Sequence, residues 1–202
     1  MSVPAVSGYR FDNPDTYLAQ ATALPAWADA LNRHISEQAA VEACLADESL
    51  CEGKLKGLRH VIVKGAGLEP DDQLRLVNRY INPRRYRHDR KEMSLSVAEG
   101  GEAKLHNHWS TLLEFLNRGG DCEDYATAKY FLLRELGFPA EDMRVVVSYD
   151  RSVRAHHAVL AIRREDGSSW LLETDNTIRK SRQRGYRFIY AINENGIRDH
   201  EQ

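Results

Sequence analysis

The spacing of apolar residues divides the chain into a helical first part and a strand-rich second part. Apolar side chains recur every three or four positions over residues 25–44, 54–66 and 69–81, which is the spacing of amphipathic helices. A proline stands at the start of the first and third segments, and Asn82-Pro83 ends the third. The preceding residues 1–20 indicate an extended lead-in with three aromatic side chains available to anchor it: Tyr9, Phe11 and Tyr17.

The second part begins with a loop and helical patterns, and then changes to strand-like patterns. Residues 84–104 are rich in charge and glycine and indicate an exposed loop. Helical patterns follow around Trp109–Leu116 and from Cys122 to Leu136, and the second predicts one buried face. After Pro139, β-type runs cover residues 144–149, 156–162, 169–174 and 187–192, and Asp166-Gly167 is a hairpin signal. Helices followed by an antiparallel sheet predict an α+β fold.

Size and charge narrow the class of protein. A chain of 202 residues with 42% hydrophobic residues suits one domain over 1–202, with an N-terminal helical part (1–70) and a core (71–202). The formal net charge of −2 gives no global basic field, so nucleic acid is not an expected partner. No apolar run approaches the length of a membrane-spanning helix, and no cysteine or histidine spacing is typical of zinc.

The stretch from Gly119 to Asp124 carries the strongest chemical signal. Gly119-Gly120 predicts a tight turn, and Asp121 is a suitable N-cap with Asp124 three residues later. Cys122 then lies in the first turn of the predicted helix, where the helix dipole favours a thiolate. Cys122 is therefore a candidate nucleophile.

A thiol nucleophile needs a base, and the base needs an orienting acid. His157 lies on a predicted strand and Asp175 follows the next one, so the hairpin could bring the two side by side. Strand alternation puts His156 and His157 on opposite faces, and the apolar pattern does not choose between them. Each residue alone has an ordinary structural interpretation.

The other two cysteines, Cys44 and Cys51, lie close together in the sequence. If they pair, Cys122 is the single free thiol, which fits an oxidising compartment. Three ordinary buried cysteines in a reducing cell are the alternative. We expect the disulfide in an exported form of the protein.

Together, Asp121-Cys-Glu-Asp-Tyr-Ala-Thr-Ala-Lys-Tyr130, the upstream Trp109, His157-Ala-Val-Leu160 and Asp175-Asn176 resemble the bacterial transglutaminase-like cysteine proteinases. The resemblance is strongest to the periplasmic adhesin proteases of that family. It implies a papain-like, transglutaminase-type fold. It also implies a catalytic triad of Cys122, His157 and Asp175, because the family places the base directly before the Ala-Val-Leu run.

The same resemblance implies a calcium site beside the cysteine. Adhesin proteases of this family depend on Ca²⁺ through acidic residues that flank the nucleophile, here Asp121, Glu123 and Asp124. Helix capping alone explains one or two of these acids. Carboxylates beside a thiol raise its pKa, however, and a bound cation would neutralise them.

The resemblance finally implies a biological role. We expect a periplasmic cysteine endopeptidase that cleaves the N-terminal region of a large surface adhesin and so controls attachment and biofilm release. An inner-membrane cyclic-di-GMP receptor would be its inhibitory partner. The N-terminal residues lack the charged and apolar parts of a signal peptide, so the periplasmic expectation requires a removed leader, and a cytoplasmic protein is the alternative. A transglutaminase and a catalytically silent calcium-binding module remain the alternative functions.

Overall fold

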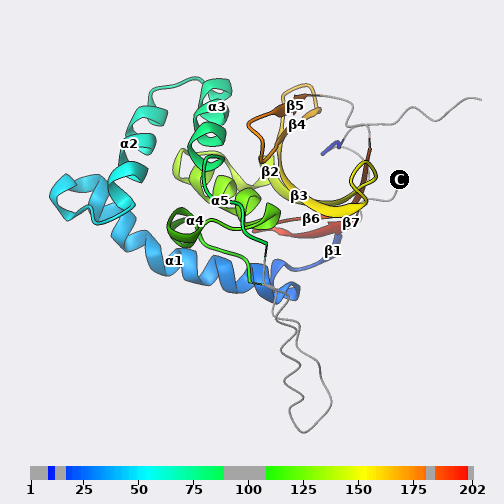
Figure 1. Cartoon of the computed structure of the whole chain (residues 1–202), viewed down its shortest axis with the longest axis horizontal. Helices are drawn as coiled ribbons and strands as arrows, with labels where there is room; N and C mark the ends of the chain where they lie inside the picture. The colour runs from blue at the N-terminus through cyan, green and yellow to red at the C-terminus, as the bar shows by residue number, and fades with distance from the viewer. Residues whose placement is uncertain (1–8, 12–16, 89–107, 181–184, 200–202) are drawn as a thin grey trace, which may run out of the picture.

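The computed structural model describes residues 9–11, 17–88, 108–180 and 185–199. Helices gather on one side and a strongly curved antiparallel sheet forms the other (Figure 1). Helices come first along the chain and most strands follow, which is the α+β architecture that the sequence predicted.

Five α-helices lie in the described part of the chain. They are α1 (Pro25–Ala46), α2 (Leu55–Ala66), α3 (Pro70–Ile81), α4 (Leu112–Arg118) and α5 (Cys122–Glu135). Prolines occupy the first positions of α1 and α3, where their missing N–H is not needed. The helical spacing of the sequence therefore located every one of these helices to within a few residues. Short 3₁₀ turns cover Ala21–Ala23, Glu48–Leu50 and Ala140–Asp142.

The strands of the described residues form one seven-stranded sheet in the order β1-β7-β6-β2-β3-β4-β5. Their bounds are β1 (Tyr17–Ala19), β2 (Met143–Asp150), β3 (Ala155–Arg163), β4 (Ser169–Leu172), β5 (Ile178–Lys180), β6 (Tyr186–Asn193) and β7 (Gly196–Asp199). Strand β3 pairs with β4 across the predicted Asp166-Gly167 hairpin, and Gly167 adopts a φ of 73° there. The pattern missed β1, β5 and β7, which are three or four residues long.

Helix α5 runs through the middle of the molecule. It contacts β2 and β3 on one side and α3 and α4 on the other. All residues from Asp124 to Leu133 are buried, including Lys129. The prediction of a single buried face was therefore wrong, because helices cover the side of α5 that faces away from the sheet.

Apolar residues of α1, α2 and α3 belong to the same hydrophobic cluster as α5 and one face of the sheet. Trp27 of α1, for example, meets Tyr130 of α5 edge-on with ring centroids 5.3 Å apart. The N-terminal helices thus complete the core around α5, which fixes where the start of α5 lies.

The opposite face of the sheet has its own smaller cluster, which includes Val146, Val159 and Leu171. Tyr9 and Phe11 are buried in it, so they anchor the lead-in as predicted. Tyr17 does not, because its side chain is 51% exposed on β1. Both faces of β2, β3 and β4 are covered, which explains why these strands show no simple alternation of apolar and polar residues.

Cys44 at the end of α1 and Cys51 form a disulfide, as predicted. The bond closes the turn that leads from α1 into α2 and leaves Cys122 as the free cysteine. No helix in the described ranges has both the length and the apolar character needed to cross a membrane. Most of the predicted loop 84–104 lies outside the described residues.

Candidate active site

The start of α5 is fixed by the turn at Gly119-Gly120. Gly119 has a φ of 72°, and a side chain there would lie 2.0 Å from the carbonyl oxygen of Arg85. Gly120 pairs with Tyr86 in a parallel bridge, and its carbonyl accepts a 2.8 Å hydrogen bond from the N–H of Arg87. A side chain at Gly120 would collide with Asp124. Only glycines let the segment after α3 approach the helix start this closely.

Asp124 holds the same turn from inside the helix. Its Oδ2 accepts a 3.2 Å hydrogen bond from the N–H of Asp121, and its Oδ1 accepts a 2.7 Å bond from the N–H of Ser110. The side chain is only 3% exposed, and burial raises its pKa to about 7 although the Ser110 N–H favours the charged form. Both oxygens of Asp124 are therefore engaged in fixing the backbone around Cys122.

The Cys122 thiol lies in the first turn of α5 and is partly buried. It donates a hydrogen bond to Glu123 Oε2, with 3.2 Å between the heavy atoms. Burial, followed by the Glu123 carboxylate, raises the pKa of Cys122 to about 12, although a hydrogen bond with the backbone of Ala158 acts in the other direction. In this arrangement the thiol keeps its proton at neutral pH, despite its place at a helix N-terminus.

Glu123, one of the acids beside the thiol, is itself perturbed. Burial and the neighbouring Asp121 carboxylate raise the pKa of Glu123. The two side chains thus form an all-oxygen pair, which is the donor type that Ca²⁺ prefers. Asp124 is less available to a cation, because each of its oxygens already accepts a backbone N–H and its side chain is buried. Within the described ranges, no three His, Cys, Asp or Glu side chains are grouped as a metal site.

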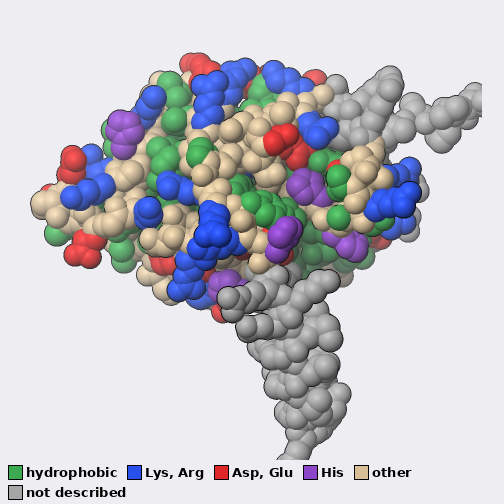
Figure 2. Space-filling view, in the orientation of Figure 1, with side chains coloured by type: hydrophobic (Ala, Val, Ile, Leu, Met, Phe, Trp, Pro, Cys, Tyr) green, Lys and Arg blue, Asp and Glu red, His purple; other side chains and the backbone are tan. Residues whose placement is uncertain are grey.

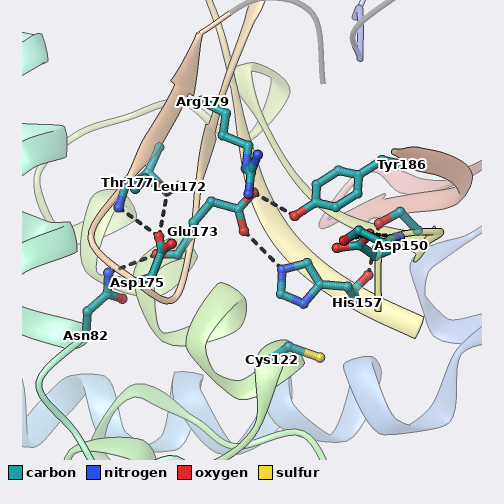
Figure 3. Close-up of polar contacts among 12 residues, drawn as sticks. Asn82, Cys122, Asp150, His157, Leu172, Glu173, Asp175, Thr177, Arg179 and Tyr186 are labelled. Carbon is teal, nitrogen blue, oxygen red and sulfur yellow. Dashed lines mark hydrogen bonds and ion pairs between the residues drawn. The ribbon is translucent and has the colours of Figure 1, made fainter. Parts of the chain in front are cut away.

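The ring of His157 is held by an acid that the sequence analysis did not select. His157 Nε2 lies 3.0 Å from Glu173 Oε2, and Glu173 directly follows β4. Figure 3 shows this contact above the start of α5, where Cys122 lies. His156 also borders this part of the molecule, but it is exposed, and its ring meets Tyr149 edge-on with centroids 5.7 Å apart.

Asp175, the predicted orienting acid, lies in the exposed turn between β4 and β5. Its Oδ1 accepts hydrogen bonds from the N–H of Thr177 at 3.0 Å and from the Thr177 hydroxyl at 2.6 Å. Asn176 in the same turn has a φ of 70°. The structure therefore places Glu173, rather than Asp175, against His157, because β4 ends at Leu172 and the chain turns before Asp175 could face the ring.

One cavity of about 620 Å³ brings these groups together. Cys122, Glu123, His157, Glu173 and Asp175 all line it. Aromatic walls come from residues far apart in the sequence, which include Tyr86, Trp109, Tyr186 and Tyr190. Trp109 is 2% exposed and also packs edge-on against Trp27, so it belongs to the core and to the cavity wall at once.

The site therefore combines a cysteine at the start of a buried helix with a histidine on an adjacent strand whose ring contacts a carboxylate. The family described as bacterial transglutaminase-like cysteine proteinase matches residues 36–198 of this sequence. The chain belongs to this family. It follows that the protein is a cysteine peptidase by descent, as the Asp121–Tyr130 segment led us to expect.

Solved structures of the protein LapG share the fold of this chain. Calcium-bound LapG of Legionella pneumophila is 22% identical, with a TM-score of 0.66 over 80% of this chain and 88% of LapG. EGTA-treated LapG from the same organism gives a TM-score of 0.65, with 22% identity over 80% of this chain and 86% of that one. No curated protein sequence matches.

Sequence reasoning missed Glu173 because a glutamate at the end of a buried strand has no distinctive pattern. One signal was available: Glu173 is two residues from Leu171, so both side chains share the strand face that faces the second cluster. His157 is on that same face, two residues before Val159. The alternation of side chains along a strand could not separate Glu173 from Asp175, since residues two apart are expected on the same face.

Proposed function

We propose that this protein is a calcium-dependent cysteine endopeptidase in which Cys122 is the nucleophile and His157 is the general base. The observation that supports this most directly is that both side chains line one cavity at the start of α5. A contact between the Cys122 sulfur and the backbone of Ala158, the residue after His157, brings the thiol to β3. The family membership gives the reaction class.

Each of these residues has its own role in peptide hydrolysis. His157 takes the proton of Cys122, and the sulfur attacks the carbonyl carbon of the scissile bond. The backbone N–H of Cys122, at the positive end of α5, stabilises the oxyanion. His157 then gives its proton to the leaving amine, and water hydrolyses the thioester.

The Cys122 thiol must break its hydrogen bond to Glu123 before it can give its proton to His157, because the thiol proton is donated to Glu123 Oε2 in this structure. Asp121 and Glu123 would hold Ca²⁺, with backbone or water oxygens completing the shell. When bound there, Ca²⁺ would supply positive charge that offsets the effect of these acids on the thiol. Asp124 is the weakest of the three expected ligands, because its oxygens hold the turn. Calcium-bound and EGTA-treated forms of LapG support this part of the proposal.

The resemblance to periplasmic adhesin proteases extends the proposal to biology. The substrate is the N-terminal region of a large surface adhesin, the inhibitory partner is an inner-membrane cyclic-di-GMP receptor, and the location is the periplasm. The disulfide between Cys44 and Cys51 supports an oxidising compartment. Cleavage of the adhesin would release attached cells.

The test is cleavage of the purified adhesin N-terminal region by wild-type protein and by Cys122→Ala in the presence of Ca²⁺. We expect cleavage by the wild type only, with unchanged circular dichroism of the variant. A labelled amine added to the reaction detects a transglutaminase, which would transfer the acyl group to the amine instead of water. Full cleavage by a well-folded Cys122→Ala protein would rule out the mechanism. A Cys122 that fails to react with a thiol probe under any metal condition would indicate a silent module.

A further inference from the structure

Glu173 is held in place more completely than its position after a strand requires. Its Oε1 accepts hydrogen bonds from Arg179 Nε at 2.7 Å and from the Tyr186 hydroxyl at 2.8 Å. Its other oxygen, Oε2, faces His157 Nε2 at 3.0 Å. Figure 3 shows the carboxylate between these three side chains. The contacts come from β3, β5 and β6, so three strands converge on one carboxylate.

The backbone of Glu173 is fixed as well. Its N–H donates a 3.0 Å hydrogen bond to the carbonyl of Thr177. Its own carbonyl accepts bonds from Lys129 Nζ at 2.6 Å and from Asn82 Nδ2 at 2.8 Å. Lys129 is fully buried in α5 and Asn82 directly follows α3. The side chain and the main chain of Glu173 are thus both immobilised, which is what a residue that aims another side chain needs.

We propose that Glu173, rather than Asp175, is the positioning acid of His157 in this peptidase. The inference rests on the proposed function, since it assigns the partner of the proposed base. Glu173 is 3% exposed and makes every one of its side-chain contacts within the cavity wall, whereas Asp175 uses its Oδ1 for Thr177 in an exposed turn.

The contact also selects the tautomer of His157. Glu173 is ionised, because hydrogen bonds from His157 and Tyr186 and the charge of Arg179 outweigh burial and hold its pKa below the usual value. An ionised carboxylate only accepts, so the ring proton must be on Nε2. Nδ1 then carries the lone pair and is the nitrogen that can take the proton of Cys122.

Glu173→Gln tests this assignment sharply. Arg179 and Tyr186 both donate to the same oxygen, so the new carbonyl oxygen stays with them and the new NH₂ group faces His157. The NH₂ group can only donate to Nε2, which moves the ring proton to Nδ1 and prevents this nitrogen from accepting a proton. We expect kcat to fall by about 100-fold or more with KM changed less than about threefold.

Asp175→Asn is the matched control, since it makes the same isosteric change two residues away. We expect it to keep kcat within about threefold of the wild type. Glu173→Asp should recover part of the activity lost in Glu173→Gln. Tyr186→Phe keeps the ring and removes one donor to Glu173, and we expect a smaller loss of kcat than in Glu173→Gln. Thermal unfolding of each variant separates loss of fold from loss of activity.

Nitrogen-15 NMR of the His157 ring gives a readout that does not depend on any substrate. We expect the Nε2–H tautomer in the wild type and in Asp175→Asn, and the Nδ1–H tautomer in Glu173→Gln. An unchanged tautomer with kcat within threefold in Glu173→Gln, or a loss confined to Asp175→Asn, would overturn the assignment of Glu173. A tautomer switch in a protein that cleaves no peptide would instead overturn the proposed function and leave Glu173 as the partner of His157.

Discussion

The Nζ of Lys129 donates a 2.6 Å hydrogen bond to the backbone carbonyl of Glu173. This joins the middle of the central helix to the end of β4, next to the acid that contacts His157. Burial lowers the pKa of Lys129 to about 7, against the opposing charges of Glu173 and Asp175. A fully buried amine is costly to charge, and the bond to the Glu173 carbonyl gives this one a partner inside the core.

Lys129→Met should flatten the pH dependence of stability and weaken activity. The unfolded lysine binds a proton up to pH about 10.5, whereas the folded one loses it above about 7, so this residue makes stability rise with pH between those values. Urea unfolding at pH 7 and pH 9 measures the rise, which we expect to be larger in the wild type than in the variant. Lys56→Met, at an exposed site on α2, is the control and should leave the rise unchanged. We expect Lys129→Met to lower kcat by about tenfold, because one of the two bonds to the Glu173 carbonyl is lost. An identical dependence of stability on pH in the wild type and in Lys129→Met would contradict a lowered pKa of Lys129.

Glu123→Gln should make the thiol more reactive in metal-free protein. The Glu123 carboxylate is the second cause, after burial, that raises the pKa of Cys122 to about 12. Removing its charge lowers the pKa, and each unit corresponds to about 1.4 kcal/mol of bias against the thiolate. The rate of iodoacetamide alkylation against pH measures this directly, since Cys122 is the free cysteine. Burial and Asp121 raise the pKa of Glu123 to about 8, so the wild-type carboxylate carries its charge only near and above that pH. We expect the wild-type rate to rise without a plateau up to pH 9, and the variant to react faster between pH 8 and pH 9.

The matched control for this experiment is Glu141→Gln, which changes an exposed acid outside the cavity. It should alkylate like the wild type. Equal rates in all three proteins would show that Glu123 does not control the thiol, even though the two side chains are hydrogen-bonded.

Removal of Ca²⁺ should stop peptide cleavage. EGTA-treated protein should be inactive, and added Ca²⁺ should restore activity better than Mg²⁺, which keeps its waters and demands a stricter geometry. Glu123→Gln should bind Ca²⁺ weakly and lose calcium-dependent activity, because it removes one of the two carboxylates. Calorimetric titration with Ca²⁺ measures binding separately from activity. Full activity of metal-free protein would show that Asp121 and Glu123 act only at the start of the helix and not as ligands of a required Ca²⁺.

Reduction of the disulfide between Cys44 and Cys51 should cost little stability. The two residues are seven apart, and closing so short a loop contributes at most about 2–3 kcal/mol in the loop-entropy picture. Cys44→Ser/Cys51→Ser measured by urea unfolding checks the magnitude, and we expect peptidase activity to remain. Mass spectrometry of alkylated, non-reduced protein from the periplasm checks the bond itself. Two alkylated thiols at these positions would remove this support for an oxidising compartment.

The sequence alone located the helices, the main hairpin and the start of α5. These features rest on local chemistry, since prolines start helices, glycines permit the turn at Gly119-Gly120, and Asp-Gly favours a hairpin. The Asp121–Tyr130 segment also gave the family, because residues next to a nucleophile are contiguous in sequence.

Only the tertiary structure decided which acid meets His157. Glu173 and Asp175 share the same strand parity, and their sequence separation from His157 differs by only two residues. The end of β4 at Leu172, the turn held by Thr177, and the converging groups of Arg179 and Tyr186 place Glu173 there instead. These contacts join segments that are distant in sequence, so no local propensity could have selected between the two carboxylates.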